Sequence, residues 1–262
     1  MTLNLAAIQA ALPGQEFLLQ KQVSANRGTY YSMWGGAGYP ASAGAPGNTT
    51  TGLIPTNATT GAVPFRSPNG TIRFGRMQVQ HADLQPGVTW LCDRLWHAGA
   101  FSLTSSTTFS ITPTAITRPS GATDAELWLE IQAVTSGTTL TASVSYTNQA
   151  GTSGHTTNTA SIVGLSAGDA IPLQLAAGDT GVKSVQSLTV TKSGTAAGTC
   201  NLVLLRRLTA AYSAVGGTYQ DPIDWFQAGL PTLYADSCLF FLSLTENTNA
   251  EDVNILLNLF EA

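Results

Sequence analysis

Residues 126–208 decide the fold, through four segments: ELWLEIQAV (126–134), TTLTASVSYTNQAG (138–151), IPLQLAAGDTGVKSVQSLTV (171–190) and CNLVLLRRL (200–208). In the first segment Leu127, Leu129 and Ile131 alternate with Trp128 and Glu130. Side chains of a β-strand point alternately to opposite faces, so a period of two indicates a strand with one face in a core. This stretch therefore predicts the core of an antiparallel β-sandwich.

The second and third segments repeat the alternation with hydroxyl side chains in the polar positions. Thr141, Ser143 and Ser145 separate apolar residues in one segment, and Thr189 separates Leu188 from Val190 in the other. Because β-branched threonine fits a pleated, half-exposed surface, a chain this rich in threonine can still be ordered. We expect sheets with one dry face and one Thr/Ser face.

The chain as a whole is predicted to be mainly β: a jelly-roll-like antiparallel β-sandwich over residues 71–262, preceded by a helix and a long extended arm over residues 1–70. Leu5, Ile8 and Leu12 have helical spacing, and Pro13-Gly14 ends this short N-terminal helix. A helix of two to three turns is marginal alone and must dock. It docks either on its own domain or on a neighbouring subunit, and both readings stay open here.

The arm begins after an aromatic cluster, Tyr30, Tyr31 and Trp34. Residues 35–70 are rich in Gly, Ala, Pro and Thr, show no period and contain many turn formers. Loops this long are unusual inside a compact domain unless they are functional or extend over a partner. The tract is therefore either an arm that wraps a partner or a flexible loop.

The remaining segments are predicted as follows. Residues 71–77 and 88–91 are strands, and VTWLCDRLWHAG (88–99) is a strand that runs into a short helix with Leu91, Leu95 and Trp96 on one face. The sequence Asp-Pro-Ile-Asp at 221–224 has a cap, a first-turn proline and a second carboxylate, so it predicts a short helix near 221–228. DSCLFFLSLT (236–245) is a buried strand, and VNILLNLFEA (253–262), which fits both periods, is assigned to a strand.

Composition limits the possible functions. Only 10% of the 262 residues are charged, against roughly 25% in an average globular domain. The surface is therefore either buried against other subunits or neutral, hydroxyl-rich and soluble, and both readings remain open. The net charge of −4 and the pI near 5.2 argue against nucleic-acid binding, which needs a basic face.

Targeting and redox signals are also missing. The first residues, MTLNLAAIQAALPG, lack the basic region of a signal peptide, and no stretch approaches the ~20 apolar residues of a membrane helix. Cys92, Cys200 and Cys238 lie far apart without a CxxC pair, so zinc binding and a disulfide framework are not expected. Reduced, buried thiols are predicted.

The motif search gives no catalytic, cofactor or metal site. Residues 164–168 match the pattern G-x-S-x-G, but no histidine follows, and a turn is the better interpretation. His81, His97 and His155 are scattered without metal-ligand spacing. Glu126 and Glu130 would lie about 13 Å apart on a strand, too far for a glycosidase pair. The chain is predicted not to be an enzyme.

Five segments carry a family resemblance: LNLAAIQAALPG (3–14), SVSYTNQAGTSGHTT (143–157), LQLAAGDTGVKSVQSLTV (173–190), LVLLRRL (202–208) and GLPTLYADSCLFFL (229–242). They resemble β-rich structural proteins of the virions of tailed bacteriophages. The resemblance covers most of the chain, contains no catalytic signature and carries no site residues over. It implies a β-rich particle component, made in the host cytoplasm and located in the virion.

The functional expectation follows from that resemblance and the low charge. We expect a capsid decoration, or cement, protein that forms homo-oligomers, with a trimer favoured, and bridges subunits of the major capsid protein or of other virion proteins. The expected partner contacts are Leu5, Ile8, Leu12, Tyr30, Tyr31 and Trp34. A tail-tube or neck component is one alternative. A carbohydrate- or receptor-binding module, with the aromatic cluster stacked on sugars, is another. Nucleic acid and membrane are not expected partners.

Overall fold

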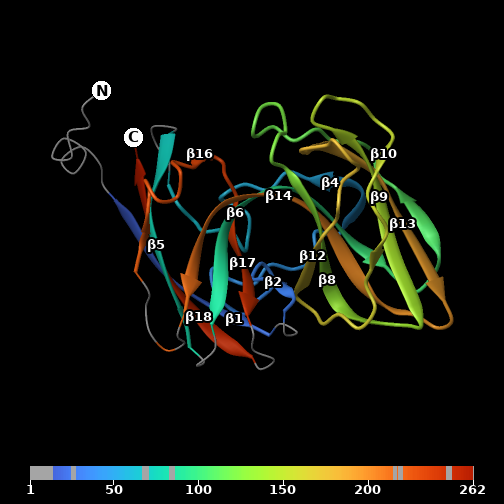
Figure 1. Ribbon diagram of the computed structural model, residues 1–262, viewed down its shortest axis with the longest axis horizontal. Coiled ribbons are helices and arrows are strands. Elements are labelled where there is room, and N and C mark those ends of the chain that lie inside the picture. The colour runs from blue at the N-terminus through green and yellow to red at the C-terminus, as the bar shows by residue number, and fades with distance from the viewer. Residues whose placement is uncertain are drawn as a thin grey trace.

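The computed structural model describes residues 14–24, 28–66, 71–82, 86–214, 217, 221–245 and 250–261. All regular secondary structure in these ranges is β-strand, which confirms the β-rich prediction. The strands form three sheets, and one of them closes on itself. Figure 1 shows the closed sheet in the middle of the molecule, with one open sheet on either side.

The closed sheet is a six-stranded barrel in the order β14, β8, β12, β2, β17, β6 and back to β14, with β4 added outside β6. Its strands are β14 (Ala197–Ser213), β8 (Glu126–Ser136), β12 (Asp169–Pro172), β2 (Tyr30–Ser32), β17 (Leu239–Thr245), β6 (Gly87–Ser102) and β4 (Asn48–Leu53). Closure depends on β14, which pairs with β8 along one edge and with β6 along the other. Three register shifts along the β14–β6 pair mark the bulges that bend such a sheet.

The first open sheet, which we call the terminal sheet, joins the first and last described strands of the chain. It consists of β15 (Ile223–Asp224), β5 (Thr71–His81), β18 (Glu251–Glu261), β1 (Gln15–Val23) and β3 (Gly38–Tyr39), in that order, with β16 (Thr232–Tyr234) also paired to β5. β18 lies between β5 and β1 and pairs antiparallel with both.

The second open sheet, which we call the hydroxyl sheet, consists of β10 (His155–Thr156), β9 (Thr139–Asn148), β13 (Val182–Ser193) and β7 (Thr107–Ser110), with β11 (Ala160–Ser161) also paired to β9. Leu140, Val144 and Leu188 are fully buried on its inner face. Thr141, Ser143 and Thr189 on the outer face are partly exposed. The predicted dry face and Thr/Ser face are both present here.

Three apolar clusters fill the spaces between and within the sheets. One lies between the hydroxyl sheet and the barrel and contains Leu127, Leu129 and Ile131. A second lies between the terminal sheet and the barrel, and a third, which contains Trp128, lies inside the barrel. Both faces of β8 are therefore buried from Leu127 to Ile131, since one faces the hydroxyl sheet and the other faces the barrel interior.

The predicted jelly-roll-like sandwich with short helices is therefore wrong. The sandwich prediction assumed that the second face of residues 126–134 meets water, whereas barrel closure covers that face. The boundary at residue 70 stays a prediction, although β1 and β2 pair directly with strands from residues 71–262. The N-terminal helix lies outside the described residues.

The helix expected at 221–228 is a two-residue strand followed by a turn. The Asp224 carboxylate does accept the N–H groups of Phe226 and Gln227, at 3.0 and 2.8 Å, as a helix cap would. Gly229 then takes a positive φ of 72° and ends the turn. The segment is too short for helix propagation to offset the cost of nucleation.

The short helix expected within residues 91–96 is also wrong, because β6 runs through it unbroken. Leu91 packs toward the terminal sheet, whereas Leu95 and Trp96 pack toward the hydroxyl sheet. This change of side produced the apparent helical spacing. It coincides with a register shift between β14 and β6, where Leu204 pairs with Trp96 and Leu205 pairs with Arg94.

The predicted extended arm is a covering layer on the chain's own barrel. Residues 35–66 include β3 and β4, and Ala43, Val63 and Phe65 are buried. The N–H of Val63 donates to the carbonyl of Leu239 in β17 at 2.8 Å. Small residues suit this tract because it lies close against aromatic side chains. A Cβ at Gly52 would lie 2.3 Å from the Trp96 ring.

Candidate functional site

A buried ion pair occupies the barrel interior. Arg94 of β6 donates from Nη1 and Nη2 to the two carboxylate oxygens of Glu130 in β8, at 2.6 and 2.7 Å. The Arg94 side chain is 0% exposed and that of Glu130 is 7% exposed. Ser32 of β2 also donates to Glu130, at 2.5 Å. This one carboxylate therefore ties together three strands of the barrel wall.

Aromatic rings and a neutral histidine surround the guanidinium of Arg94. Its carbon lies 4.4 Å from the Trp34 ring centre and 5.4 Å from that of Phe240. Its Nε donates to Nδ1 of His97 at 2.9 Å. Burial, and then the positive charge of Arg94, lower the pKa of His97 to about 2. His97 is therefore a neutral acceptor, and Arg94 and Glu130 compensate each other's charge.

A cavity of about 100 Å³ lies beside this ion pair. Its walls come from β2 and the turn after it, from β8, and from the turn before β12, and they include Tyr31, Ser32, Trp34, Glu130, Gln132 and Gly168. The short strand β12 begins only at Asp169. Just before it, the backbone of Gly168 accepts a hydrogen bond from the Ser32 N–H and donates one to the Ile131 carbonyl, which links β2 to β8. The cavity lies where pairing between β12 and its neighbours ends.

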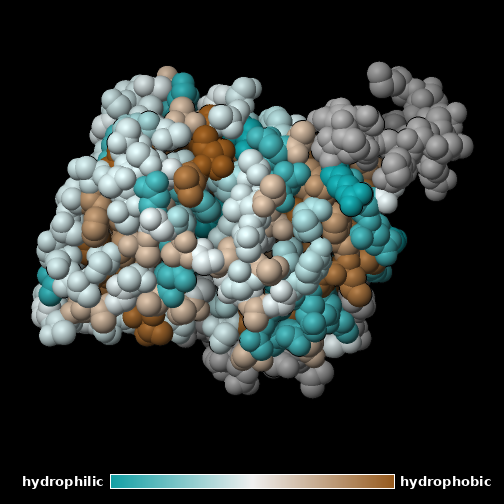
Figure 2. All heavy atoms as spheres, turned by 180° about the vertical axis from the view of Figure 1, so that it is seen from behind, coloured by the Kyte–Doolittle hydropathy of each residue, from teal (hydrophilic) through white to brown (hydrophobic). Residues whose placement is uncertain are grey.

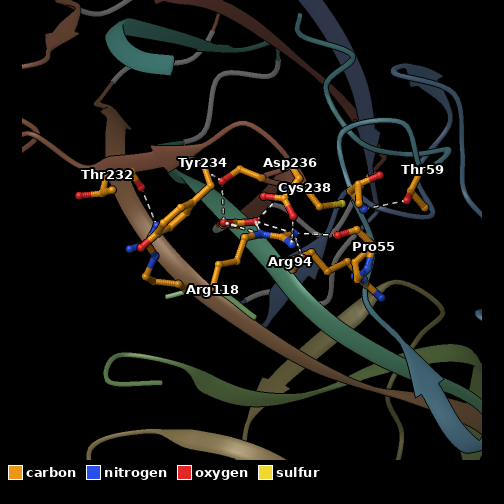
Figure 3. A network of polar contacts seen from close by, with 12 residues as sticks. Pro55, Thr59, Arg94, Arg118, Thr232, Tyr234, Asp236 and Cys238 are labelled. Atoms are coloured by element: carbon orange, nitrogen blue, oxygen red, sulfur yellow. Dashed lines mark hydrogen bonds and ion pairs between the residues drawn. The ribbon is translucent and has the colours of Figure 1, made fainter. Parts of the chain in front are cut away.

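A second buried network fixes the outer side of β6. Asp93, which is 0% exposed, accepts hydrogen bonds from the Cys238 N–H and the Ser237 hydroxyl, both at 2.8 Å. Arg118 pairs with Asp93 at 3.3 Å and with the half-exposed Asp236 at 3.2 Å. Figure 3 shows Arg118 also reaching the carbonyl of Pro55. This network fastens the covering layer and the segment before β17 to the barrel.

A third cluster has the order of a hydroxyl–imidazole–carboxylate relay. His81 Nδ1 lies 3.0 Å from Glu251 Oε1, and His81 Nε2 lies 3.2 Å from Thr89 Oγ1. His81 and Thr89 are 0% exposed and Glu251 is 3% exposed. A Cβ at Gly87 would lie 2.5 Å from the imidazole, so the ring is closely covered. A nucleophile must be reached by its substrate, and this burial makes the cluster a structural link between β5, β18 and β6.

A fourth cluster lies at one end of the hydroxyl sheet. The Tyr146 hydroxyl donates to Asp179 at 2.7 Å, and His155 lies 2.7 Å from the same carboxylate. The hydrogen bond from Tyr146 is the main cause that lowers the pKa of Asp179. Burial, and then the bond to Asp179, raise the pKa of Tyr146 to about 12. These groups hold the loop of residues 173–181 against β9.

A buried lysine completes the set of interior charges. Lys21 of β1 is 1% exposed, and its ammonium group donates to the carbonyls of Gly36 and Pro40, both at 2.7 Å. Burial lowers the pKa of Lys21 to about 8. The lysine fixes the turn between β2 and β3 to the terminal sheet.

The predicted partner-contact residues are placed only in part. Leu5, Ile8 and Leu12 lie outside the described residues. Tyr31 and Trp34 lie on the cavity wall, at 8% and 3% exposure, and Tyr30 packs on Trp90 and Trp128 in the barrel. As partner contacts they stay a prediction, but the rings of Tyr31 and Trp34 lie inside the protein rather than on its surface.

The structure also shows the G-x-S-x-G segment and the three cysteines that the sequence analysis considered. Residues 164–168 form the expected turn, with the Ser166 N–H bonded to Asp169 at 2.8 Å. The three cysteines are free and buried, and burial raises the pKa of Cys200 and Cys238 to about 12. Among the residues that the structure describes, no group of three or more His, Cys, Asp or Glu side chains is arranged to hold a metal ion. None of the described segments forms a helix that could cross a membrane.

Sequence reasoning missed the pairing of Glu130 with Arg94 and of Asp93 with Arg118. A weak signal was present, because Glu130 lies in an apolar strand beside Trp128 and Asp93-Arg94 interrupts another apolar strand. A charge inside a predicted buried strand requires a partner of opposite sign. The sequence does not say which partner, since the two members of each pair are far apart in the chain.

Comparisons with known proteins give weak results. No family model and no curated protein matches the chain. Among solved structures, the VP2 subviral particle of infectious bursal disease virus aligns at 11% identity and a TM-score of 0.24, covering 96% of this chain and 81% of that one. The T13 viral particle of the same virus aligns at 9% identity and a TM-score of 0.24, covering 96% and 79%. These scores are too low to establish a shared fold.

Proposed function

We propose that this chain is a non-enzymatic structural protein of a virus particle, and more specifically a decoration subunit that bridges capsid subunits of a tailed bacteriophage. The family resemblance in five sequence segments motivates the proposal. The distribution of charge in the structure supports it most. The second support is the pre-ordered outer face of the terminal sheet.

About a quarter of the charged residues are buried in the described parts of the chain. Of 26 charged residues, seven are buried in the described parts of the chain: Lys21, Asp93, Arg94, Arg118, Glu130, Asp169 and Glu251. Charged surfaces oppose association, because each charge must be paired or desolvated when a partner covers it. A surface with so few charges can be covered at low cost. This is the observation that carries the proposal.

The outer face of the terminal sheet offers a contact surface. Leu18 of β1 is 69% exposed and pairs with the partly exposed Leu256 of β18. The turn after β15 adds Phe226 at 74% and Leu230 at 60% exposure. Figure 2 shows apolar patches separated by hydrophilic surface on one side of the molecule. We assign the capsid contact to this sheet and not to the tract of residues 35–66, which covers the chain's own barrel.

Side-chain hydrogen bonds hold that outer face in place. Asn258 donates to Glu16 at 3.0 Å and accepts from Arg76 at 2.7 Å, across three neighbouring strands. Asn254 donates to Gln80 at 3.2 Å in the next polar row. Side chains that are already fixed lose little freedom when a partner binds. Asn258 also bonds the charged groups of Glu16 and Arg76, so a partner can cover these rows around the apolar Leu18–Leu256 pair with both charges already hydrogen-bonded.

Copy number in a purified particle tests the function. A decoration subunit repeats over the shell, so mass spectrometry should find it in a fixed, near-stoichiometric ratio to the major capsid protein. A few copies per particle would instead indicate a tail tip or receptor-binding protein, and rings of the purified chain in negative stain would indicate a tail-tube or neck component. Either result would contradict the decoration role.

A substitution tests the contact face. Leu18→Lys should leave the chain folded, because the side chain is exposed, and should strongly weaken binding to particles that lack the protein. Thr189→Lys on the hydroxyl sheet is the matched control and should bind as the unchanged chain does. Equal binding by both variants would remove the terminal sheet as the contact face.

A further inference from the structure

The outer face of the terminal sheet carries opposite charges on its two sides. β18 runs down the middle, with β1 on one side and β5 on the other (Figure 1). Opposite Asn258 of β18 lie Glu16 of β1 and Arg76 of β5, both exposed. Arg73 is a second exposed arginine on the β5 side. The face is therefore negative on one side of β18 and positive on the other.

Glu16 and Arg76 have no counter-charge among the residues that the structure describes. Asn258 donates to Glu16 at 3.0 Å and accepts from Nε of Arg76 at 2.7 Å, so a neutral amide lies between the two charges. Within the described part of the chain, neither residue forms an ion pair. Because both side chains are exposed, each can form a charge-assisted hydrogen bond to a group of opposite sign on a partner.

The pattern of this face is its own complement. If a second copy is turned by 180° about an axis along β18 and laid against the first, each β1 lies over the β5 of the other copy. Glu16 of each copy then lies over Arg76 of the other, because both residues pair with the same position of β18. In the next two rows Leu256 meets Leu256 of the second copy, and Gln20 lies over Gln80, whose amide can both donate and accept. Packed sheets lie about 10 Å apart, a distance that a glutamate and an arginine side chain span together.

From this symmetry we infer that the free protein forms a two-fold dimer through the outer faces of two terminal sheets. Leu18, which is 69% exposed in the single chain, and Leu256 form the apolar centre, and two Glu16–Arg76 pairs between the copies lie in the adjacent row. A foreign partner would have to carry the opposite charge on each side, whereas a second copy supplies both charges by symmetry. The oligomer is then a dimer and not the trimer favoured from the sequence.

The dimer uses the face to which we assign the capsid contact. A subunit within the dimer therefore cannot bind the particle through that face, and the dimer is a storage form that must dissociate first. This consequence rests on the proposed function. The dimer itself does not, because it follows from the pattern of the face alone.

One residue of the face opposes the dimer. Asp252 lies on β18 two rows beyond Leu256, so it comes close to Asp252 of the second copy near the axis. Gln20 donates to this carboxylate at 3.3 Å, which leaves its charge in place. Like charges that face each other across an interface weaken association. Asp252→Asn should therefore tighten the dimer.

Sedimentation equilibrium of the purified chain tests the dimer. The unchanged chain should approach a mass of twice 27.2 kDa as its concentration rises. Glu16→Arg and Arg76→Glu each place like charges opposite one another, so each should raise the dissociation constant at least about tenfold. An equimolar mixture of the two variants should recover the dimer, because every altered charge then faces its opposite.

Lys183→Glu is the control, since it reverses an exposed charge on the hydroxyl sheet and should leave the dissociation constant unchanged. If a charge reversal does not fold, the conservative Asp252→Asn tests the same axis and should lower the constant. A monomer or a trimer of the unchanged chain overturns the inference. A mixture that stays monomeric also overturns it, because Glu16 and Arg76 then do not meet. None of these measurements uses particles, so their result is independent of the copy-number test.

Discussion

Strands β8 and β9 follow each other in the chain and alternate in the same way, yet their second faces lie in opposite environments. In β8 the second face carries Trp128 and Glu130, at 1% and 5% exposure, inside the barrel. In β9 it carries Thr141 and Ser143, which are partly exposed on the outer face of the hydroxyl sheet. Alternation therefore shows only that the two faces of a strand differ. The type of polar residue on the second face distinguishes a buried face, with Trp and Glu, from a partly exposed one, with Thr and Ser.

The difference also separates two ways of accommodating polar groups. Inside the barrel, ions are paired with fixed geometry, and each partner depends on the other. On the hydroxyl sheet, neutral hydroxyls bond to one another or to water, as Thr108 and Thr189 do at 3.1 Å. Loss of a polar group should therefore have a large effect in the barrel and almost none on the hydroxyl face.

The largest effect is expected for Glu130→Ala. The substitution leaves the guanidinium of Arg94 buried without its counter-charge, which should cost about 3–5 kcal/mol of unfolding free energy. Urea denaturation followed by circular dichroism measures it. The double variant Arg94→Met, Glu130→Leu removes both charges and should recover most of the loss. A loss below about 1 kcal/mol for Glu130→Ala would show that the pair does not hold the barrel together.

An apolar substitution on the inner face of the hydroxyl sheet should come next. Leu188 is 0% exposed and belongs to the cluster between this sheet and the barrel. Leu188→Ala should cost about 3 kcal/mol, through lost burial and the cavity left behind. Denaturation of the two chains side by side gives the value. A neutral result would mean that the sheet is not packed on the barrel.

A smaller effect, visible only on acidification, is expected for His97→Gln. The pKa of His97 is lowered from 6.5 to about 2, so below pH 6.5 the unfolded chain binds a proton that the folded chain does not. Stability should therefore fall as the pH drops below that value. Glutamine still accepts the bond from Arg94 and cannot be protonated in this range, so the variant should lose less stability between about pH 7 and about pH 5. Parallel slopes for the two chains would contradict this role of His97.

The smallest effect is expected for Thr189→Val on the outer face of the hydroxyl sheet. Threonine and valine have similar shapes and both suit strands, so the unfolding free energy should change by no more than about 0.5 kcal/mol. The same urea experiment measures it. A loss comparable to that of Leu188→Ala would show that the hydroxyl rows contribute to stability, and the contrast with the barrel would then disappear.

Much of the fold was predictable from local pattern. The apolar alternation of Leu140, Val144 and Leu188 located the inner face of the hydroxyl sheet, and the strands at 236–245 and 253–262 were also predicted correctly. Barrel closure was not predictable from local pattern. It depends on one long strand, β14, that pairs along both of its edges, and the sequence of a strand does not determine which strands pair with it.

The candidate site was less predictable than the fold. The sequence predicts Tyr31 and Trp34 as partner contacts, and in the structure both line the cavity. In the sequence the nearest carboxylate to Glu130 on the same strand face is Glu126, but in the structure Glu130 pairs with Arg94. That pairing depends on β14 joining β8 to β6, so it could not be inferred before the topology was known.

The position of β18 has a consequence for synthesis. β18 is the central strand that separates β1 from β5, with Leu259 opposite Gln15 and Val253 opposite His81. On the ribosome, β1 emerges long before β18, so the edge of β1 that pairs with β18 remains unpaired until β18 has been translated. The terminal sheet can therefore form only after translation of β18, and a nascent chain stalled before that point would present two unpaired strand edges to chaperones and to other nascent chains.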